Sequence, residues 1–249
     1  MRRPAERRAQ VRRVRDLMRS NILHGAYPDS KLPPEHELMA RYDAPRAVVR
    51  DALALLRHDG LVDRVQGYGT YALQPPGAHD LYDIHGVGHT PGTGFWQSVT
   101  RTQVISLHIV DTPDAVAGLM PGSGERCVQL DYLAYQGDEA VAVATNHFRL
   151  PRCAAVVDQP IRTDFYELVN RAGIEVGATR FFIGAGMADP HLAATFQVPE
   201  NTPVVNLEQV IYALDGEAID VAFIWMRADR VLLESFVAGP GYAGPVGGR

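Results

Sequence analysis

The sequence predicts an α+β protein with a small helical head and a larger body built on an antiparallel sheet. Residues 11–73 contain three stretches in which apolar residues recur at helical spacing, and two short strand-like stretches follow them. Residues 98–238 alternate between strand-like and helix-like patterns and contain an internal repeat. With 249 residues, the chain is long enough for one small and one medium domain, each with its own core.

Three helices and a β-hairpin are predicted in the head, residues 1–74. The apolar residues that indicate the first helix are Val11, Val14, Leu17, Met18, Ile22 and Leu23. Gly25 ends this helix, as glycine commonly does. Further helices are predicted over 35–42 and 46–58, and strands over 61–64 and 70–73. This order of elements within about 65 residues is the winged helix-turn-helix plan.

The body, residues 98–238, carries a weak repeat with an offset of 78 residues. Pro121 corresponds to Pro199, and residues 139–144 correspond to 217–222. Each copy is predicted to form a helix, a proline turn and two strands joined by a tight turn. Two such hairpins are expected to pair into one antiparallel sheet with helices on one face. Chance similarity between two amphipathic hairpins is the alternative explanation.

Segments rich in glycine and proline separate and end these two parts. Residues 75–97 are predicted to be a linker, and residues 239–249 a flexible tail that follows a last strand at 230–237. The linker contains His79, His85 and His89, whose spacing fits no common metal site. No metal and no cofactor are therefore predicted.

Charge is divided unevenly along the chain. Residues 1–74 hold 14 Lys+Arg and 9 Asp+Glu, whereas residues 75–249 hold 10 and 20. A basic head on an acidic body indicates that only the head meets a polyanion. The densest basic stretch consists of Arg2, Arg3, Arg7, Arg8, Arg12, Arg13 and Arg15. This stretch is interpreted as making phosphate contacts, with a solvated tail as the alternative.

Composition excludes several other classes of protein. Hydrophobic residues make up 46% and charged residues 21% of the chain, as in ordinary globular proteins. No apolar run reaches the roughly 18 residues of a membrane span, and no export signal is recognised, so a cytoplasmic protein without membrane contact is expected. The two cysteines, Cys127 and Cys153, form no CxxC or Cys/His cluster, and reduced thiols are expected.

Residues 11–73 resemble the winged-helix domain of the GntR family of bacterial transcription regulators. The matching positions are Ile22, Gly25, Leu32-Pro33, Glu35, Leu38, Ala40, Arg46, Val49-Arg50, Ala52-Leu53, Leu56, Gly60-Leu61, Gln66-Gly67 and Gly69-Thr70. The body resembles the UTRA effector domain of the HutC branch, which is related in fold to chorismate lyase. That similarity rests on the two hairpins, on Leu150-Pro151 and on residues 226–230. It implies a DNA-binding regulator, a repressor, whose operator binding a small-molecule effector controls.

The resemblance assigns the predicted third helix to the major groove of DNA. Arg46 and Arg50 lie four positions apart on that helix, and an arginine can donate two hydrogen bonds to guanine. Their alternative role is to form salt bridges with Asp43 or Asp51. The remaining predicted DNA-binding residues are Lys31, Ala47, Arg64, Gln66, Gly67, Tyr68, Gly69 and Thr70. Ala47 stands where the family often has a hydroxyl residue that touches phosphate, and Tyr68 where it more often has a basic residue.

The effector site is predicted on the strands of the two hairpins. The candidate residues are Asp131, Tyr132, Tyr135, Thr145, His147, Arg149, Tyr212, Asp220 and Trp225. Relatives carry two arginines on the strand that here reads 130–135, and this sequence has none there. A neutral or weakly polar effector with an apolar portion is therefore expected rather than a sugar phosphate, because burying a dianion without cationic partners is costly. A monoanion such as a small acid is the alternative, because Arg149 could bind a single carboxylate.

A homodimer that binds an inverted-repeat operator in double-stranded DNA is expected, because one recognition helix reads only a few base pairs. Two alternatives remain open at this point. One is a dimeric repressor that needs no ligand. The other is an enzyme of chorismate-lyase-like fold, although the sequence contains no HExxH, GxSxG or phosphate-loop motif.

Overall fold

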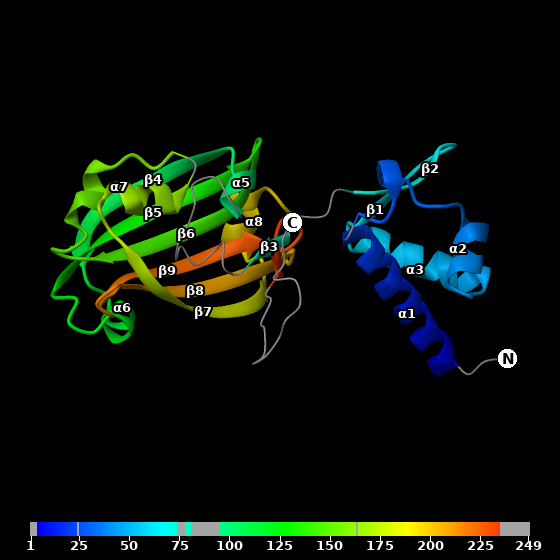
Figure 1. The fold of residues 1–249 in the computed structure, drawn as a ribbon, viewed down its shortest axis with the longest axis horizontal. Helices are drawn as coiled ribbons and strands as arrows, with labels where there is room; N and C mark the ends of the chain where they lie inside the picture. Colours follow the sequence, from blue (N-terminus) through cyan, green and yellow to red (C-terminus); the bar gives the residue numbers. More distant parts are fainter. Residues whose placement is uncertain (1–3, 24, 74–77, 81–94, 163, 235–249) are drawn as a thin grey trace, which may run out of the picture. The chain divides into compact units, whose positions relative to one another are not determined.

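The computed structural model describes residues 4–23, 25–73, 78–80, 95–162 and 164–234 (Figure 1). The chain divides into two compact units, Met1–Pro76 and Gly77–Arg249. Each unit has its own hydrophobic core. Among the described residues, no helix is long and apolar enough to cross a membrane.

The N-terminal unit contains helices, a short 3-10 turn and one hairpin. In chain order these are α1 (Pro4–Leu23), η1 (Pro28–Ser30), α2 (Glu35–Arg41), α3 (Arg46–His58), β1 (Val62–Val65) and β2 (Gly69–Ala72). The predicted elements are all present, although α1 begins seven residues before Val11. The arginines at positions 7 to 15 therefore lie on a helix and not on a frayed tail. The expected winged helix-turn-helix arrangement is observed.

The core of this unit lies where α1, α2 and α3 meet. Met18, Val49 and Leu56 are completely shielded from solvent. The spacing of the buried positions on α3 follows the helical period, so one face of α3 is buried and the other is left free. Leu17 is one of the apolar residues that indicated this helix, but it is 55% exposed because it lies beside the buried stripe of α1.

The wing is the turn between β1 and β2, which pair antiparallel. Gly67 and Gly69 have φ angles of 81° and 131°, which L side chains rarely adopt. These two glycines therefore allow the tight turn that leaves Tyr68 projecting, with 72% of its surface exposed.

The C-terminal unit is built on a six-stranded antiparallel sheet with the order β4-β5-β6-β9-β8-β7, which runs from top to bottom in Figure 1. The strands are β4 (Arg101–Asp111), β5 (Arg126–Gln136), β6 (Glu139–Arg149), β7 (Val176–Met187), β8 (Pro203–Ala213) and β9 (Ala218–Arg227). The helices are α5 (Phe95–Ser98), α6 (Asp114–Leu119), η2 (Ala154–Asp158), α7 (Phe165–Arg171) and α8 (Pro190–Phe196).

The internal repeat corresponds to a local twofold relation in this sheet. The two hairpins, β5–β6 and β8–β9, meet through antiparallel pairing of β6 with β9. In that pairing Thr145 lies opposite Phe223, which is its own equivalent 78 positions further along the chain. The register is therefore the one that a twofold axis between these two residues requires.

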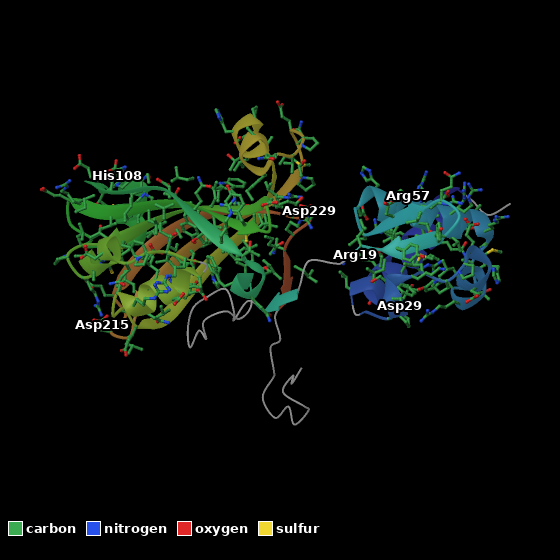
Figure 2. The ribbon with its side chains drawn as sticks, turned by 90° about the horizontal axis from the view of Figure 1, so that it is seen from above. Arg19, Asp29, Arg57, His108, Asp215 and Asp229 are labelled. Carbon is green, nitrogen blue, oxygen red and sulfur yellow. The ribbon has the colours of Figure 1, made fainter. Side chains whose placement is uncertain are left out.

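Helices cover both faces of the sheet, whereas helices on one face were expected. On one face, α6 packs through Val116 and Met120, and α8 packs through Ala193 and Phe196. The opposite face is covered by α5, α7 and the segment that contains η2, which bring Phe95, Trp96, Val156, Phe165 and Tyr166 onto the strands. Figure 2 shows α8 (yellow) and α7 (yellow-green) on opposite sides of the sheet.

The predicted linker contains regular structure. Strand β3 (Ala78–Asp80) pairs in parallel with β10 (Leu232–Glu234), and α5 packs on the sheet. Glycines and prolines in this segment had indicated a loop, but pairing with a distant strand cannot be seen in local sequence. Residues 81–94 and the predicted tail, 239–249, lie outside the described residues, as does part of the predicted last strand, 230–237.

The carboxyl of Asp164 begins α7, and its removal is expected to destabilise the C-terminal unit. It is buried and accepts hydrogen bonds from the backbone N–H groups of Tyr166, at 2.8 Å, and Glu167, at 3.3 Å. Asp164→Ala should lower the free energy of unfolding by about 0.5–2 kcal/mol, measured by urea unfolding of the full chain. The exposed Asp158 begins no helix, and Asp158→Ala should change it by less than about 0.5 kcal/mol. Equal effects of the two substitutions would contradict this role.

Candidate functional site

The exposed face of α3 borders a groove of about 860 Å³ in the N-terminal unit. Its walls come from α2, α3, the wing and the segment that joins η1 to α2. The charged residues that line it are Lys31, Glu35, Arg46, Arg50, Arg57 and Arg64, with His36 beside them. One carboxylate thus faces five cationic side chains, and a groove of this charge attracts a polyanion.

Arg46 and Arg50 are both exposed on the groove side of α3. Arg46 Nε donates to Glu35 Oε2 at 2.9 Å, so its partner is neither Asp43 nor Asp51. Asp51 is instead bound by Arg7 of α1, with a distance of 2.6 Å between Nη2 and Oδ2. Exposed pairs of this kind stabilise a protein by only about 0–1 kcal/mol, so DNA phosphates or bases can replace Glu35 at little cost.

The other predicted DNA-binding residues divide into two groups. Lys31, Arg64, Tyr68, Gly69 and Thr70 line the groove. The other three, Ala47, Gln66 and Gly67, are exposed nearby but do not line it.

Sequence reasoning missed His36 and Arg57, which also line the groove. Helical spacing could have found Arg57, because it lies seven positions after Arg50 on the same face of α3. Figure 2 labels Arg57 on this helix, and Arg19 on α1.

The C-terminal unit contains a small cavity between the sheet and the helices α5 and α7. Its volume is about 30 Å³, roughly that of one water molecule. The lining residues are Phe95, Trp96, Tyr132, Ala134, Ala142, Ala144, Asn146, Phe165, Tyr166, Leu207, Gln209, Ile224 and Met226. None of them is charged, and five are aromatic.

Few polar groups reach this cavity, and they are tied to one another. Gln209 Nε2 donates to the Tyr166 hydroxyl at 2.6 Å, and Asn146 Nδ2 donates to Asp220 Oδ2 at 2.7 Å. Asn146 Oδ1 and Asp220 Oδ1 are buried and have no hydrogen-bond partner. The cavity therefore combines an apolar wall with a lining residue, Asn146, whose amide oxygen has no partner.

Burial raises the pKa of Asp220 to about 8, and the hydrogen bonds from Asn146 and from the backbone of His147 offset this only in part. The carboxyl is 1% exposed and lies behind Asn146 on the same face of the sheet. Near neutral pH Asp220 is therefore predominantly protonated, and it adds no full negative charge to the cavity.

The structure does not bring the nine predicted effector residues together, because strand alternation divides them between the two faces of the sheet. Tyr132 lines the cavity and Asp220 lies behind it. The other seven lie on the face that carries α6 and α8: Asp131, Tyr135, Thr145, His147, Arg149, Tyr212 and Trp225.

Several of these seven side chains have a structural role on that opposite face. Asp131 accepts hydrogen bonds from Ser106, Gln129 and Thr145. Burial alone would raise its pKa, but these bonds outweigh burial and hold the pKa below its usual value. Arg149 donates to the backbone oxygens of Pro121, Gly122 and Ala218, and so fastens the turn that follows α6.

The remaining members of that group pack against helices or neighbouring strands. Tyr135 and Trp225 pack against the hydrophobic cluster that includes Ala193 and Phe196 of α8. Tyr212 packs against the cluster that includes Val116 of α6. His147 is buried with its ring edge against Phe223, and burial lowers its pKa.

Most of the cavity-lining residues were not found from the sequence. Trp96 falls inside the predicted linker, and Phe165 and Tyr166 belong to α7, which lies outside the two hairpins. The alternation of Ala142, Ala144 and Asn146 along β6 was the one available signal, since these residues share a face.

No group of three or more His, Cys, Asp or Glu side chains in the described part of the chain is placed to hold a metal ion. Of the linker histidines, His85 and His89 lie outside the described residues. Cys127 and Cys153 are free and buried, and burial raises the pKa of Cys153 to about 12. A thiol with this pKa is inert at neutral pH.

A winged helix-turn-helix with a cationic groove, together with a second unit that contains an uncharged aromatic cavity, indicates a DNA-binding transcription regulator. Residues 10–72 match the bacterial regulatory proteins of the gntR family, and residues 97–231 match the UTRA domain. The chain belongs to the GntR family of transcription regulators, with a UTRA effector domain. It is therefore a regulator and not an enzyme.

Similar proteins include repressors. The chain is 29% identical over 155 residues to the histidine utilization repressor of Pseudomonas aeruginosa, a match that spans 61% of this chain and 60% of that relative. It is 21% identical over 227 residues to the repressor NagR of Bacillus subtilis, which covers 87% of this chain and 90% of NagR. The crystal structure of PhnF from Mycobacterium smegmatis shares the fold, with a TM-score of 0.61 and 22% identity over 90% of this chain and 99% of PhnF.

Arg46→Ala and Arg50→Ala are each expected to weaken binding to the specific operator by about 1–3 kcal/mol, and binding to random DNA much less. The reason is that both side chains lie on the face of α3 that borders the groove, where they can reach base edges. Fluorescence anisotropy with operator and scrambled duplexes measures both affinities. Arg19→Ala, outside the groove, should leave their ratio unchanged. Equal losses on both duplexes for the α3 variants would refute base reading.

Asp220 should make the stability of the C-terminal unit depend on pH. Its pKa is about 8 in the folded protein and about 3.9 in an unfolded chain, so folding takes up a proton between these values. The free energy of unfolding should therefore fall as pH rises from about 4 through about 8. In Asp220→Asn this decline should disappear, as measured by urea unfolding at a series of pH values. Asp131→Asn is the control and should leave the decline in place, because the pKa of Asp131 is lowered.

Proposed function

We propose that this protein is a homodimeric repressor that binds an inverted-repeat operator and is controlled by a neutral effector bound in the UTRA cavity. The observation that carries this proposal is that a cationic groove and an uncharged cavity lie in different units of the chain. An exposed groove lined by five cationic side chains lies in one unit, and an uncharged aromatic cavity lies in the other. A protein that acts on DNA in this way works in the cytoplasm.

In the proposed complex, α3 enters the major groove. Arg46 and Arg50 then reach base edges, because both are exposed on the face of α3 that borders the groove. Lys31 and Arg64 lie on other walls of the groove and suit phosphate contacts, which position a protein without specifying sequence. Tyr68 projects from the wing and suits a contact in the neighbouring minor groove.

The proposed effector is an uncharged molecule with an apolar portion. The cavity has no Lys, Arg or His in its lining, so a phosphate group would be buried there without a cationic partner. The cost of burying an unpaired ion is several kcal/mol. Arg149, the arginine that could have served an anion, lies on the opposite face of the sheet with its guanidinium engaged by backbone oxygens.

Strand β3 offers a route from the cavity to the DNA-binding unit. It comes shortly after the N-terminal unit along the chain and pairs with β10. Val231, directly before β10, belongs to the hydrophobic core that surrounds the cavity, and Leu233 of β10 packs against that core. A ligand that favours one arrangement of this core would thereby favour one arrangement of the strand pair, and would shift the population of DNA-binding dimers.

A ligand-independent dimeric repressor is the second candidate, and the small cavity volume favours it. About 30 Å³ holds a water molecule but no organic effector unless the wall moves. A thermal-shift measurement with fractionated cell extract separates the two candidates. A fraction that raises the melting temperature and changes operator affinity supports the sensor, whereas the absence of such a fraction supports the ligand-independent repressor.

The protein is expected to be a dimer at micromolar concentration and to protect both halves of its operator. A single α3 reads too few base pairs for specific binding, and a twofold dimer doubles the site. Analytical ultracentrifugation gives the mass, and footprinting shows the protected bases. A monomer with undiminished operator affinity would contradict the proposal.

Calorimetry is expected to show no binding of amino-sugar phosphates to the purified protein, because no cation lines the cavity. Apolar lactones and small aromatic amides of similar size are the matched comparison. Micromolar binding of a sugar phosphate that persists in Tyr132→Phe and Asn146→Ala variants would show that the effector site lies elsewhere.

A further inference from the structure

Trp96 fills the space that a ligand would need in the aromatic cavity. It belongs to α5, is 8% exposed and lies inside a ring of other aromatic side chains. Its indole stacks on Phe165 with a centroid distance of 6.4 Å and lies 6.4 Å from Tyr132, with its edge toward Tyr166 at 6.5 Å. The surrounding walls are thus shaped for a flat ring, and the chain supplies that ring itself.

The polar end of the same cavity contains a buried acceptor that has no hydrogen-bond partner. Asn146 is 1% exposed, its Nδ2 is engaged by Asp220, and its Oδ1 has no partner. Asn146 is itself one of the residues that line the cavity. Leaving a buried acceptor unsatisfied costs about 1–3 kcal/mol, and a ligand with an N–H or O–H group would remove that cost.

Among the described elements that line the cavity, α5 is the shortest. The strands are fixed by hydrogen bonds to neighbours on both sides, and α7 is capped by Asp164. Helix α5 has four residues, and Ser98 Oγ accepts a side-chain hydrogen bond from Gln136 Nε2 at 2.6 Å. Removing one indole from the cavity is therefore the local change that makes room for a ring of the same size.

We propose that the effector is a flat, uncharged aromatic molecule with an N–H donor, which displaces Trp96 from the aromatic cavity and donates a hydrogen bond to Asn146 Oδ1. This inference rests on the proposed function and adds the chemical class of the ligand and the side chain that it replaces. Helix α5 precedes all six strands of the sheet in the chain, so displacement of Trp96 acts on the part of the C-terminal unit that comes early after the DNA-binding unit.

A protein with a single tryptophan tests the displacement. The chain has two tryptophans, and Trp225 lies on the opposite face of the sheet beside α8, so Trp225→Phe leaves Trp96 as the only emitter. Benzimidazole, which is the size of indole and carries an N–H, is the probe. Its binding should shift the emission of Trp96 to longer wavelength as the indole becomes solvated. The Trp96→Phe protein, which emits only from Trp225, is the control and should show no shift.

The methylated probe and a cavity variant test the hydrogen bond and the site. 1-Methylbenzimidazole lacks the donor and should bind about tenfold more weakly than benzimidazole. Trp96→Ala removes the resident ring, so calorimetry should show at least tenfold tighter benzimidazole binding than in wild type. Asn146→Ala should make the two probes bind equally well.

Three results would overturn the inference. Absence of benzimidazole binding to Trp96→Ala would refute the aromatic site, and equal binding of both probes to wild type would refute the role of Asn146. Binding without a shift of Trp96 emission would refute displacement. Operator affinity, measured in parallel, separates this inference from the proposed function. Displacement of Trp96 without any change in operator affinity would confirm the site and contradict its control of DNA binding.

Discussion

The antiparallel pairing of β6 with β9 is the interaction on which the rest of the effector unit depends. It joins the two repeats into one sheet and sets Thr145 opposite Phe223 on the local twofold axis. Because side chains alternate across a strand, the same register places Asn146 and Ile224 toward the aromatic layer, and Trp225 toward α8. A shift of one residue would exchange the two sets and would bring His147 and Thr145 into the apolar layer without partners.

The groove beside α3 and the aromatic cavity differ in their exposure to solvent and in their charge. In the groove beside α3 the charges are exposed, and breaking the ion pair between Arg46 and Glu35 costs little free energy when a polyanion binds. The aromatic cavity is apolar and buried, so the unsatisfied oxygen of Asn146 is significant there. The groove is accordingly suited to a long, highly charged partner, and the cavity to a small molecule that brings few polar atoms.

The first described elements of the C-terminal unit, β3 and α5, are held by that unit. Strand β3 is fixed to β10, and α5 is fixed to the core through Phe95 and Trp96. Both contacts reach the hydrophobic core that encloses the cavity, since Val231 and Leu233 belong to its surroundings. Repacking of this core would therefore change the positions of β3 and α5, which follow the DNA-binding unit in the chain.

Local sequence determined the head almost completely. Its helices depend on the spacing of apolar residues, its wing on Gly67 and Gly69, and the shared face of Arg46 and Arg50 on their helical spacing. All of these are short-range features. The repeat in the body was visible too, because Pro121 and Pro199 and the two tight turns recur at a fixed offset.

Tertiary structure alone decided which residues of the body form the cavity. Period-two alternation assigns residues to two faces but does not say which face is covered by which helix, so Asp131 and Arg149 were grouped with Tyr132 although they lie across the sheet. Trp96 and Phe165 come from segments outside the hairpins and meet Tyr132 only after the chain has folded. Long-range packing of this kind leaves no local pattern, and the pairing of β3 with β10 was hidden for the same reason.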